Sequence, residues 1–383
     1  MVEKLFLDLL CAEINNVKPS SGTFNLINDE ILYKLFKLSK HHDLSHLIAN
    51  VLEKNNCLAN NDNLKSVFLN DRNVAIYRYG IMNYEFERIC AVLNSYQIKF
   101  IPLKGSVLRT LYPEPWMRTS CDIDILIKKE SLLFAIKTLQ HELKYNYTKT
   151  GGHDAHLFSD NGVHLELHYA LSRTGETWSN ILNDIWDYSY NQELYCYSLS
   201  NEMIYFYHVA HMAMHLKKGG CGVRSFIDLF LLLKNKAYDT EDLNKLLKAG
   251  GLLTFNNAIV EVVNNWFGDG QKTKLVNDME DYILTSGTFG NLKNSVAIAK
   301  SKRGGKWNFV FKRIIVPYKD LKFQYPILQK YPVLYPFYNI KRWFRLFKKD
   351  VREKSIIELK EATQGNKELQ DKVANLLKDL KIY

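Results

Sequence analysis

The sequence predicts an α+β fold, in which a mixed β-sheet core with flanking helices lies between helical regions at the two ends of the chain. Residues 164–168 alternate strictly between polar and apolar side chains, and residues 118–127 form a second strand-like run. Up to residue 96, and again from residue 201, apolar residues recur at helical spacing instead. We therefore expect the sheet to lie between about residues 98 and 200.

Four regions follow from these patterns. We expect an N-terminal helical region over residues 1–75 and the sheet-containing core over residues 76–200, which begins with a long helix. A helical domain is expected over residues 201–300. A basic, aromatic-rich helical region is expected over residues 301–383.

The composition is that of a globular protein with room for two or three domains. The chain has 383 residues, of which 46% are hydrophobic and 24% are charged, and no apolar run is long enough to span a membrane. Its first residues include Glu3 and Asp8 and lack a basic start, so we expect no signal peptide. The net charge of +10 favours polyanionic partners. Scattered cysteines without a C-x-x-C pair indicate a reducing, cytoplasmic location; they are Cys11, Cys57, Cys90, Cys121, Cys196 and Cys221.

The segment Asp122-Ile123-Asp124 is the strongest candidate for chemistry. On a strand, Asp122 and Asp124 point to the same side, while the isoleucines at 123, 125 and 127 point to the other. Two neighbouring carboxylates repel each other unless a positive group lies between them, and a divalent metal ion is the usual one. A solvated strand face is the alternative interpretation.

A possible phosphate-binding turn precedes this pair. Residues 98–103 read as a short strand, Lys104-Gly105-Ser106 follows, and residues 107–112 look like the start of a helix. Glycine lets a backbone approach a phosphate, while serine and the first N–H groups of a helix donate hydrogen bonds to it. Lys104 would add positive charge.

A third carboxylate is expected from the strand at residues 164–168. His164, Glu166 and His168 share one face of this strand, and Leu165 and Leu167 lie on the other. Glycine-containing turns before it are consistent with a hairpin. Glu166 would then complete a cluster of three carboxylates of the kind used in two-metal phosphoryl chemistry.

Together these motifs resemble the DNA polymerase β-type nucleotidyltransferase superfamily, and most closely the bacterial family of uncharacterised nucleotidyltransferases. The match covers about residues 75 to 200, and the later helices resemble the family more loosely. The gap between Ser106 and Asp122 is longer than usual and contains Pro113-Glu114-Pro115-Trp116, which leaves the choice of base open. The matching residues are Leu103-Lys104-Gly105-Ser106, Leu111-Tyr112, Arg118, Asp122-Ile123-Asp124 and Glu166-Leu167-His168.

The resemblance implies a nucleotidyltransferase-type fold and transfer of a nucleoside monophosphate from an NTP, expected to be ATP, to an acceptor hydroxyl. Asp122, Asp124 and Glu166 would be the catalytic residues and the ligands of Mg²⁺ or Mn²⁺. The nucleotide would be bound by Lys104, Gly105, Ser106 and Arg118. Arg118 would either stabilise developing charge or pair with a carboxylate to hold the strand.

Four histidines are expected to lie near the acceptor or behind the carboxylates. His168 would orient Glu166 or touch the acceptor. His208, His211 and His215 form a stripe on a helix over residues 202–215, and Asp228 in the next helix is a natural hydrogen-bond partner for one of them. The stripe would face the cleft or pack between helices, and zinc binding is the alternative.

The region from residue 302 to residue 349 is rich in Lys, Arg and aromatic residues and contains a single acidic residue, Asp320. It would suit RNA, an anionic membrane surface, or simply a helical cap with solvated lysines. The rival to an enzyme is a non-catalytic nucleotide- or RNA-binding module on the same fold. A metal-dependent phosphodiesterase would need a water-activating constellation that these motifs do not supply. Acceptor, NTP and oligomeric state stay open.

Overall fold

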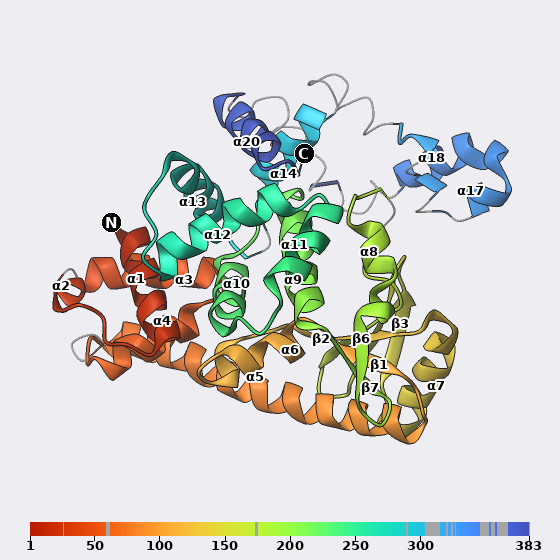
Figure 1. Cartoon of the computed structure of the whole chain (residues 1–383), viewed down its shortest axis with the longest axis horizontal. Coiled ribbons are helices and arrows are strands. Elements are labelled where there is room, and N and C mark those ends of the chain that lie inside the picture. The colour runs from red at the N-terminus through yellow and green to blue at the C-terminus, as the bar shows by residue number, and fades with distance from the viewer. Residues whose placement is uncertain are drawn as a thin grey trace. The chain divides into compact units, whose positions relative to one another are not determined.

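The structure of the protein is a computed structural model (Figure 1). The structure describes residues 1–382 except 26, 59–61, 173–174, 289, 303–314, 319–320, 323–324, 326, 345–351, 354–356 and 358–366. It contains two compact units. Unit 1 comprises residues 1–212 and 223–280, and unit 2 comprises residues 213–222 and 281–383.

Unit 1 contains a seven-stranded mixed sheet, which confirms the predicted α+β class. The strand order is β3-β4-β5-β2-β1-β7-β6. The pairs β2/β5 and β1/β7 are parallel and the other neighbours are antiparallel. The strands are β1 (Phe100–Pro102), β2 (Asp122–Ile127), β3 (Asn146–Thr150), β4 (Asp154–Phe158), β5 (His164–His168), β6 (Ser189–Glu193) and β7 (Cys196–Leu199).

Helices lie before, between and after the strands in the sequence, and short 3₁₀ helices are labelled η. Before it come α1 (Val2–Asn15), α2 (Ser21–Phe24), α3 (Asp29–His41), α4 (Ser45–Lys54) and α5 (Asp62–Ser95). Between the strands lie α6 (Gly105–Leu108), η1 (Arg109–Leu111), η2 (Pro115–Met117), η3 (Lys129–Ser131), α7 (Leu132–Leu143), α8 (Ser179–Asn183) and η4 (Ile185–Tyr188). The helices that follow are α9 (Asn201–Leu216), α10 (Val223–Asn235), α11 (Thr240–Ala249), α12 (Leu253–Phe267), α13 (Lys274–Ser286), α14 (Leu292–Lys302), α17 (Ile327–Lys330), η5 (Pro332–Leu334), α18 (Tyr335–Trp343) and α20 (Lys367–Asp379).

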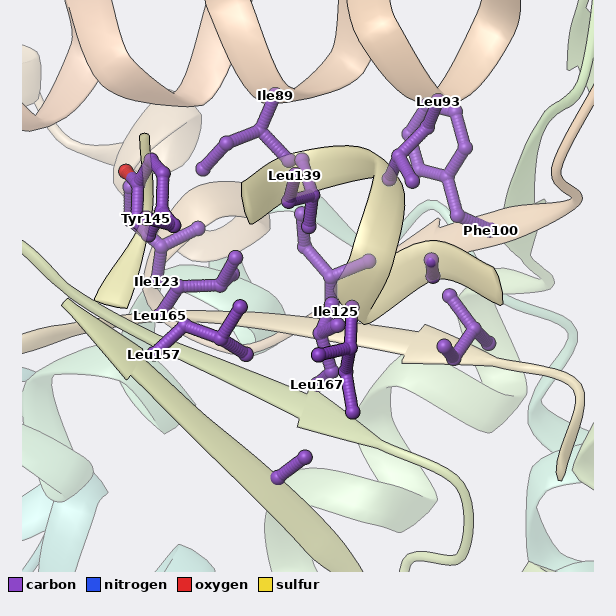
Figure 2. Close-up of a cluster of buried hydrophobic side chains, with 14 of the residues drawn as sticks. Ile89, Leu93, Phe100, Ile123, Ile125, Leu139, Tyr145, Leu157, Leu165 and Leu167 are labelled. Atoms are coloured by element: carbon purple, nitrogen blue, oxygen red, sulfur yellow. The ribbon is translucent and has the colours of Figure 1, made fainter. Parts of the chain in front are cut away.

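The apolar face of the sheet packs against α5 and α7. Figure 2 shows Ile89 and Leu93 of α5 directed at the strands, where Ile123, Ile125 and Leu165 are also fully or almost fully buried. The alternation of β2 and β5 places these apolar side chains on one side and leaves the polar ones on the other. The core therefore fixes which face of the sheet is free to carry chemistry.

The long helix α5 connects the sheet to the N-terminal helices (Figure 1). It begins at Asp62, whereas the sequence predicted a long helix over residues 76–96 that follows a separate helical region over residues 1–75. Phe68, Ala75, Met82 and Ile89 are spaced seven residues apart and all are buried, so one face of the helix is used along both halves. The N-terminal end packs on α4, which also packs on α1.

Unit 2 is built around the packing of α14 on α20. Val296 and Ile298 of α14 and Val373 and Leu377 of α20 are buried there. Much of the predicted basic region lies outside the described residues, including Arg345 and Phe347. Among the helices that the structure describes, none is both long and apolar enough to cross a membrane.

Candidate active site

Two neighbouring strands, β2 and β5, place the predicted carboxylates on the polar face of the sheet, and β4 adds His156 beside them. In the parallel pair β2/β5, Asp122 is opposite His164 and Asp124 is opposite Glu166. In the antiparallel pair β4/β5, Glu166 is in turn opposite His156. Because side chains of paired residues point the same way, these five residues share one face of the sheet. The predicted register of Asp122, Asp124 and Glu166 is therefore present.

The carboxylate of Asp124 contacts two basic side chains, those of Lys104 and His168. Lys104 Nζ lies 2.7 Å from Asp124 Oδ1, and His168 Nε2 lies 2.7 Å from the same oxygen. Burial raises the pKa of Asp124, but Lys104 and His168 together lower it well below its usual value. Conversely, burial lowers the pKa of His168, but its hydrogen bonds to Asp124 and Glu166 raise it overall. Asp124 is thus an anion with its charge already partly compensated.

Asp122 is compensated less, although Lys104 and Arg118 both act to lower the pKa of its carboxyl. Its burial, together with repulsion from Asp124, raises the pKa of Asp122 to about 6. Glu166 differs, since a hydrogen bond from His168 lowers the pKa of that carboxyl. The site therefore carries excess negative charge at Asp122, which an added cation would relieve.

The donor set fits a hard divalent cation. Asp124, Glu166 and His168 offer ligand atoms that lie within 4.8 Å of one another, and Asp122 is two residues from Asp124 on the same face. Carboxylate oxygens are the ligands that Mg²⁺ and Mn²⁺ prefer. Asp124 Oδ1 is also bonded to Lys104, so a cation bound there would share this oxygen with the ammonium or displace it.

The turn at Lys104-Gly105-Ser106 begins a helix of one turn, α6. Lys104 has a positive φ of 45°, and its ammonium group donates a hydrogen bond to Asp124 of β2. A Cβ at Gly105 would lie 3.1 Å from Arg118 Nη1 and 3.2 Å from Ser120 Cβ. A larger residue at 105 would therefore require the side chains of Arg118 and Ser120 to shift by a few tenths of an ångström. Ser106 is half-buried, and its N–H donates to the Leu103 carbonyl.

Arg118 makes a buried ion pair with α10. Its Nη2 lies 2.9 Å from Asp228 Oδ2, and its Nε donates to Asp228 Oδ1 at 3.3 Å. The Tyr112 hydroxyl donates to the same carboxylate at 2.7 Å. Only 12% of the Arg118 side chain and 1% of the Asp228 side chain are exposed. These contacts fasten the segment before β2 to α10, which favours the second of the two roles predicted for Arg118.

Helix α9 contributes a residue that the sequence did not single out, Tyr207. Burial raises the pKa of Tyr207 to about 12, and its hydroxyl interacts electrostatically with Lys104 and Asp124. Its neighbour His208 instead contacts α10, where its Nε2 lies 2.9 Å from the Ser225 carbonyl oxygen. His211 packs its ring against Tyr207. One signal for Tyr207 was available, because it lies one turn before His211 on the same helix.

The role predicted for His215 stays a prediction. This residue belongs to the segment of α9 that falls in unit 2. The sequence also missed Asp154 and His156 of β4, which lie on the polar face beside Glu166. The alternation Asp154, His156, Phe158 was the available signal, since it mirrors that of residues 164–168.

Comparison with protein families agrees with this geometry. Residues 32–268 match the model of a family described as uncharacterised nucleotidyltransferase, and the chain belongs to that family. No curated protein and no solved structure matches the chain. The resemblance predicted from the motifs is confirmed, and the fold is that of a nucleotidyltransferase. Family membership indicates nucleotidyl transfer as the general activity and a nucleoside triphosphate as substrate.

Proposed function

We propose that the protein is a metal-dependent nucleotidyltransferase that moves a nucleoside monophosphate from an NTP, ATP in the first instance, to an acceptor hydroxyl. The single observation that carries the proposal is the register of β2 and β5, which aligns Asp124 with Glu166 and keeps Asp122 on the same face. Lys104 lies beside this group. Carboxylates placed this close together repel one another and destabilise the fold unless a cation offsets their charge.

Asp122, Asp124 and Glu166 would hold Mg²⁺ or Mn²⁺. Such an ion neutralises phosphate charge and acidifies an acceptor hydroxyl. Lys104 would stay near the triphosphate and stabilise negative charge there. Gly105 and Ser106 would border the phosphates, while Arg118 would position the strand through Asp228.

In the proposed reaction, the acceptor oxygen forms a bond to the α-phosphorus as the bond from that phosphorus to its bridging oxygen breaks. Pyrophosphate leaves with the bonding electron pair, and the hydroxyl proton passes to a carboxylate or to solvent. His168, which contacts both Asp124 and Glu166, would keep these carboxylates in place. The acceptor would approach beside Tyr207 and His211 of α9.

The proposal is tested by Mg²⁺-dependent release of pyrophosphate from each NTP, with fractionated cell extract as the source of acceptor. Asp122→Asn and Asp124→Asn should each lower the rate about a thousandfold or more, because each removes a carboxylate from the metal-binding group. Asp160→Asn is the matched control, since Asp160 lies exposed in the turn between β4 and β5. Release at the wild-type rate by both variants would contradict the assignment of Asp122 and Asp124, and no release by the wild type with any NTP would favour the non-catalytic binding module.

We further propose that the region 302–349 binds a polyanion and does not carry the chemistry. Support comes from its described part: Phe337 and Trp343 of α18 are exposed, and Lys341 and Arg342 stand beside them. Exposed aromatic and basic side chains together suit a phosphate-bearing partner. We also propose a cytoplasmic location, because all six cysteines are free.

A further inference from the structure

A second group of possible metal ligands lies next to the candidate active site. His156 Nδ1 and His164 Nε2 are 3.0 Å apart, and both face Glu166 Oε1. The distances from that oxygen are 3.5 Å to His156 Nδ1 and 3.8 Å to His164 Nε2. Three potential donor atoms thus form a small triangle on β4 and β5.

The triangle has the size of a metal site. A point equidistant from its three corners lies about 2 Å from each atom, which is the bond length of zinc to imidazole nitrogen and carboxylate oxygen. An ion slightly out of this plane would have three protein ligands and room for further ligands on its open side. Without an ion, a proton between the two imidazoles accounts for their 3.0 Å separation.

The neighbours of the triangle orient its ligands. His156 Nε2, the nitrogen that faces away, lies 3.4 Å from Asp154 Oδ1. A carboxylate behind a ligating histidine is the usual arrangement, because it holds the proton on the outer nitrogen and turns the lone pair of the inner one toward the ion. The other oxygen of Glu166, Oε2, lies 3.4 Å from His168 Nε2, which leaves Oε1 directed at the two histidines.

An ion can also reach this group from solvent. The exposed fractions are 17% for the side chains of His156 and Glu166 and 21% for His164. Each residue is fixed by its register, because Glu166 is paired with His156 and lies two residues from His164 on the same strand face. The donors are held by two strands and need no loop to close over them.

We propose that His156, His164 and Glu166 form a binding site for a transition-metal ion of the zinc type. Two imidazoles and one carboxylate favour Zn²⁺, Co²⁺ or Fe²⁺, whereas Mg²⁺ prefers a set made of oxygen atoms alone. The site differs from the proposed Mg²⁺ site of Asp122, Asp124 and Glu166, with which it has Glu166 in common. It goes beyond the proposed transfer activity, since it requires no NTP.

The test is a titration of the full-length, metal-stripped protein with Co²⁺, with Mg²⁺ in large excess. Visible absorption reports nitrogen ligation, and equilibrium dialysis gives the number of ions per chain. We expect about one ion per chain and a higher melting temperature on binding. His156→Asn and His164→Gln should each weaken binding more than about a hundredfold, and Asp154→Asn should weaken it about tenfold to a hundredfold.

Two controls separate this site from the rest of the chain. His141→Gln, at an exposed histidine of α7, should bind Co²⁺ as the wild type does. Asp122→Asn should abolish nucleotidyl transfer and still bind Co²⁺, so failure of the proposed activity and failure of this site are distinguishable. Melting curves confirm that each variant folds. The proposal is overturned if the wild type binds no Co²⁺ under these conditions. It is also overturned if binding survives both histidine substitutions, or is lost with Asp122→Asn alone.

Discussion

The position of Asp122 destabilises the folded protein, because its carboxylate is ionised beside the carboxylates of Asp124 and Glu166. Folding raises the pKa of the Asp122 carboxyl to about 6. The ionised carboxylate therefore destabilises the folded state fully above pH 6, and this effect disappears below the pKa of the unfolded chain. In the absence of divalent ions, Asp122→Asn should therefore stabilise the protein by about 1–2 kcal/mol near pH 7.5 and by almost nothing near pH 4. Thermal melts at the two pH values, with Asp160→Asn as control, measure this difference. A less stable Asp122→Asn variant near pH 7.5 would contradict the assigned charge repulsion.

Ser106 offers a second test at the residue scale. Its hydroxyl is expected to contact a phosphate that is present in both the ground state and the transition state. Ser106→Ala should then raise the KM for the NTP about tenfold and change kcat little, since uniform binding appears in KM. Steady-state kinetics with each NTP measures both constants. An unchanged KM would mean that Gly105-Ser106 serves only as the turn between β1 and α6.

Among the elements, strand β5 has one face that packs in the core and one face that carries the proposed chemistry. Leu165 is fully buried in the core, while Glu166 is on the polar face. Leu165→Gln should cost about 3 kcal/mol or more, because it removes apolar packing and buries an unpaired amide. Glu166→Gln should keep the melting temperature near that of the wild type and lower transfer about a hundredfold or more. A thermal melt beside an activity assay compares the two, and the reverse result would mean that the register is wrong.

The ion pair between Arg118 and Asp228 joins two elements far apart in the sequence. Burial raises the pKa of Asp228, but Arg118 and His208 lower it overall. The ion pair therefore stabilises the fold at pH values above the pKa that Asp228 has in the unfolded chain. This stabilisation is lost as the pH falls through the lower pKa that Asp228 has in the folded protein. Asp228→Asn should cost about 3–5 kcal/mol at neutral pH, because it leaves Arg118 buried without its counter-charge. Urea denaturation measures the loss, and the exposed Lys245→Met is the control. A cost no larger than that of the control would contradict the stabilising role of this ion pair.

The sequence predicted the elements better than the contacts between them. The strands β2 and β5 and the helix α9 were predicted because each has a local period that a single window reveals. The partner of Arg118 was not predicted. Asp228 lies 110 residues away, and the sequence does not distinguish it from several other acidic residues that could pair with an arginine. His156 and Asp154 were missed for a similar reason: they become neighbours of Glu166 only through the antiparallel pairing of β4 with β5. The beginning of α5 was misplaced because its first half buries fewer side chains than its second.

At the scale of the whole molecule, the excess positive charge requires counter-charge from outside the basic region. Reversing the charge of Lys341 and Arg342 should weaken binding to RNA or to anionic liposomes, with affinity for RNA falling steeply as salt increases. Filter binding and liposome co-sedimentation at low and high salt distinguish the two partners. The matched control reverses the charge of Lys245 and Lys248, which are exposed on α11. If neither RNA nor liposomes bind at low salt, the region is a structural cap.

The central claim is that the carboxylates of β2 and β5 transfer the α-phosphoryl group of an NTP together with its nucleoside. Its most direct test is a comparison of ATP labelled with ³²P at the α position or at the γ position, incubated with the protein, Mg²⁺ and fractionated cell extract. The account predicts that α label becomes attached to an acceptor, that γ label appears in pyrophosphate, and that Asp122→Asn abolishes both. Attachment of γ label to the acceptor, or undiminished α transfer by Asp122→Asn, would contradict it.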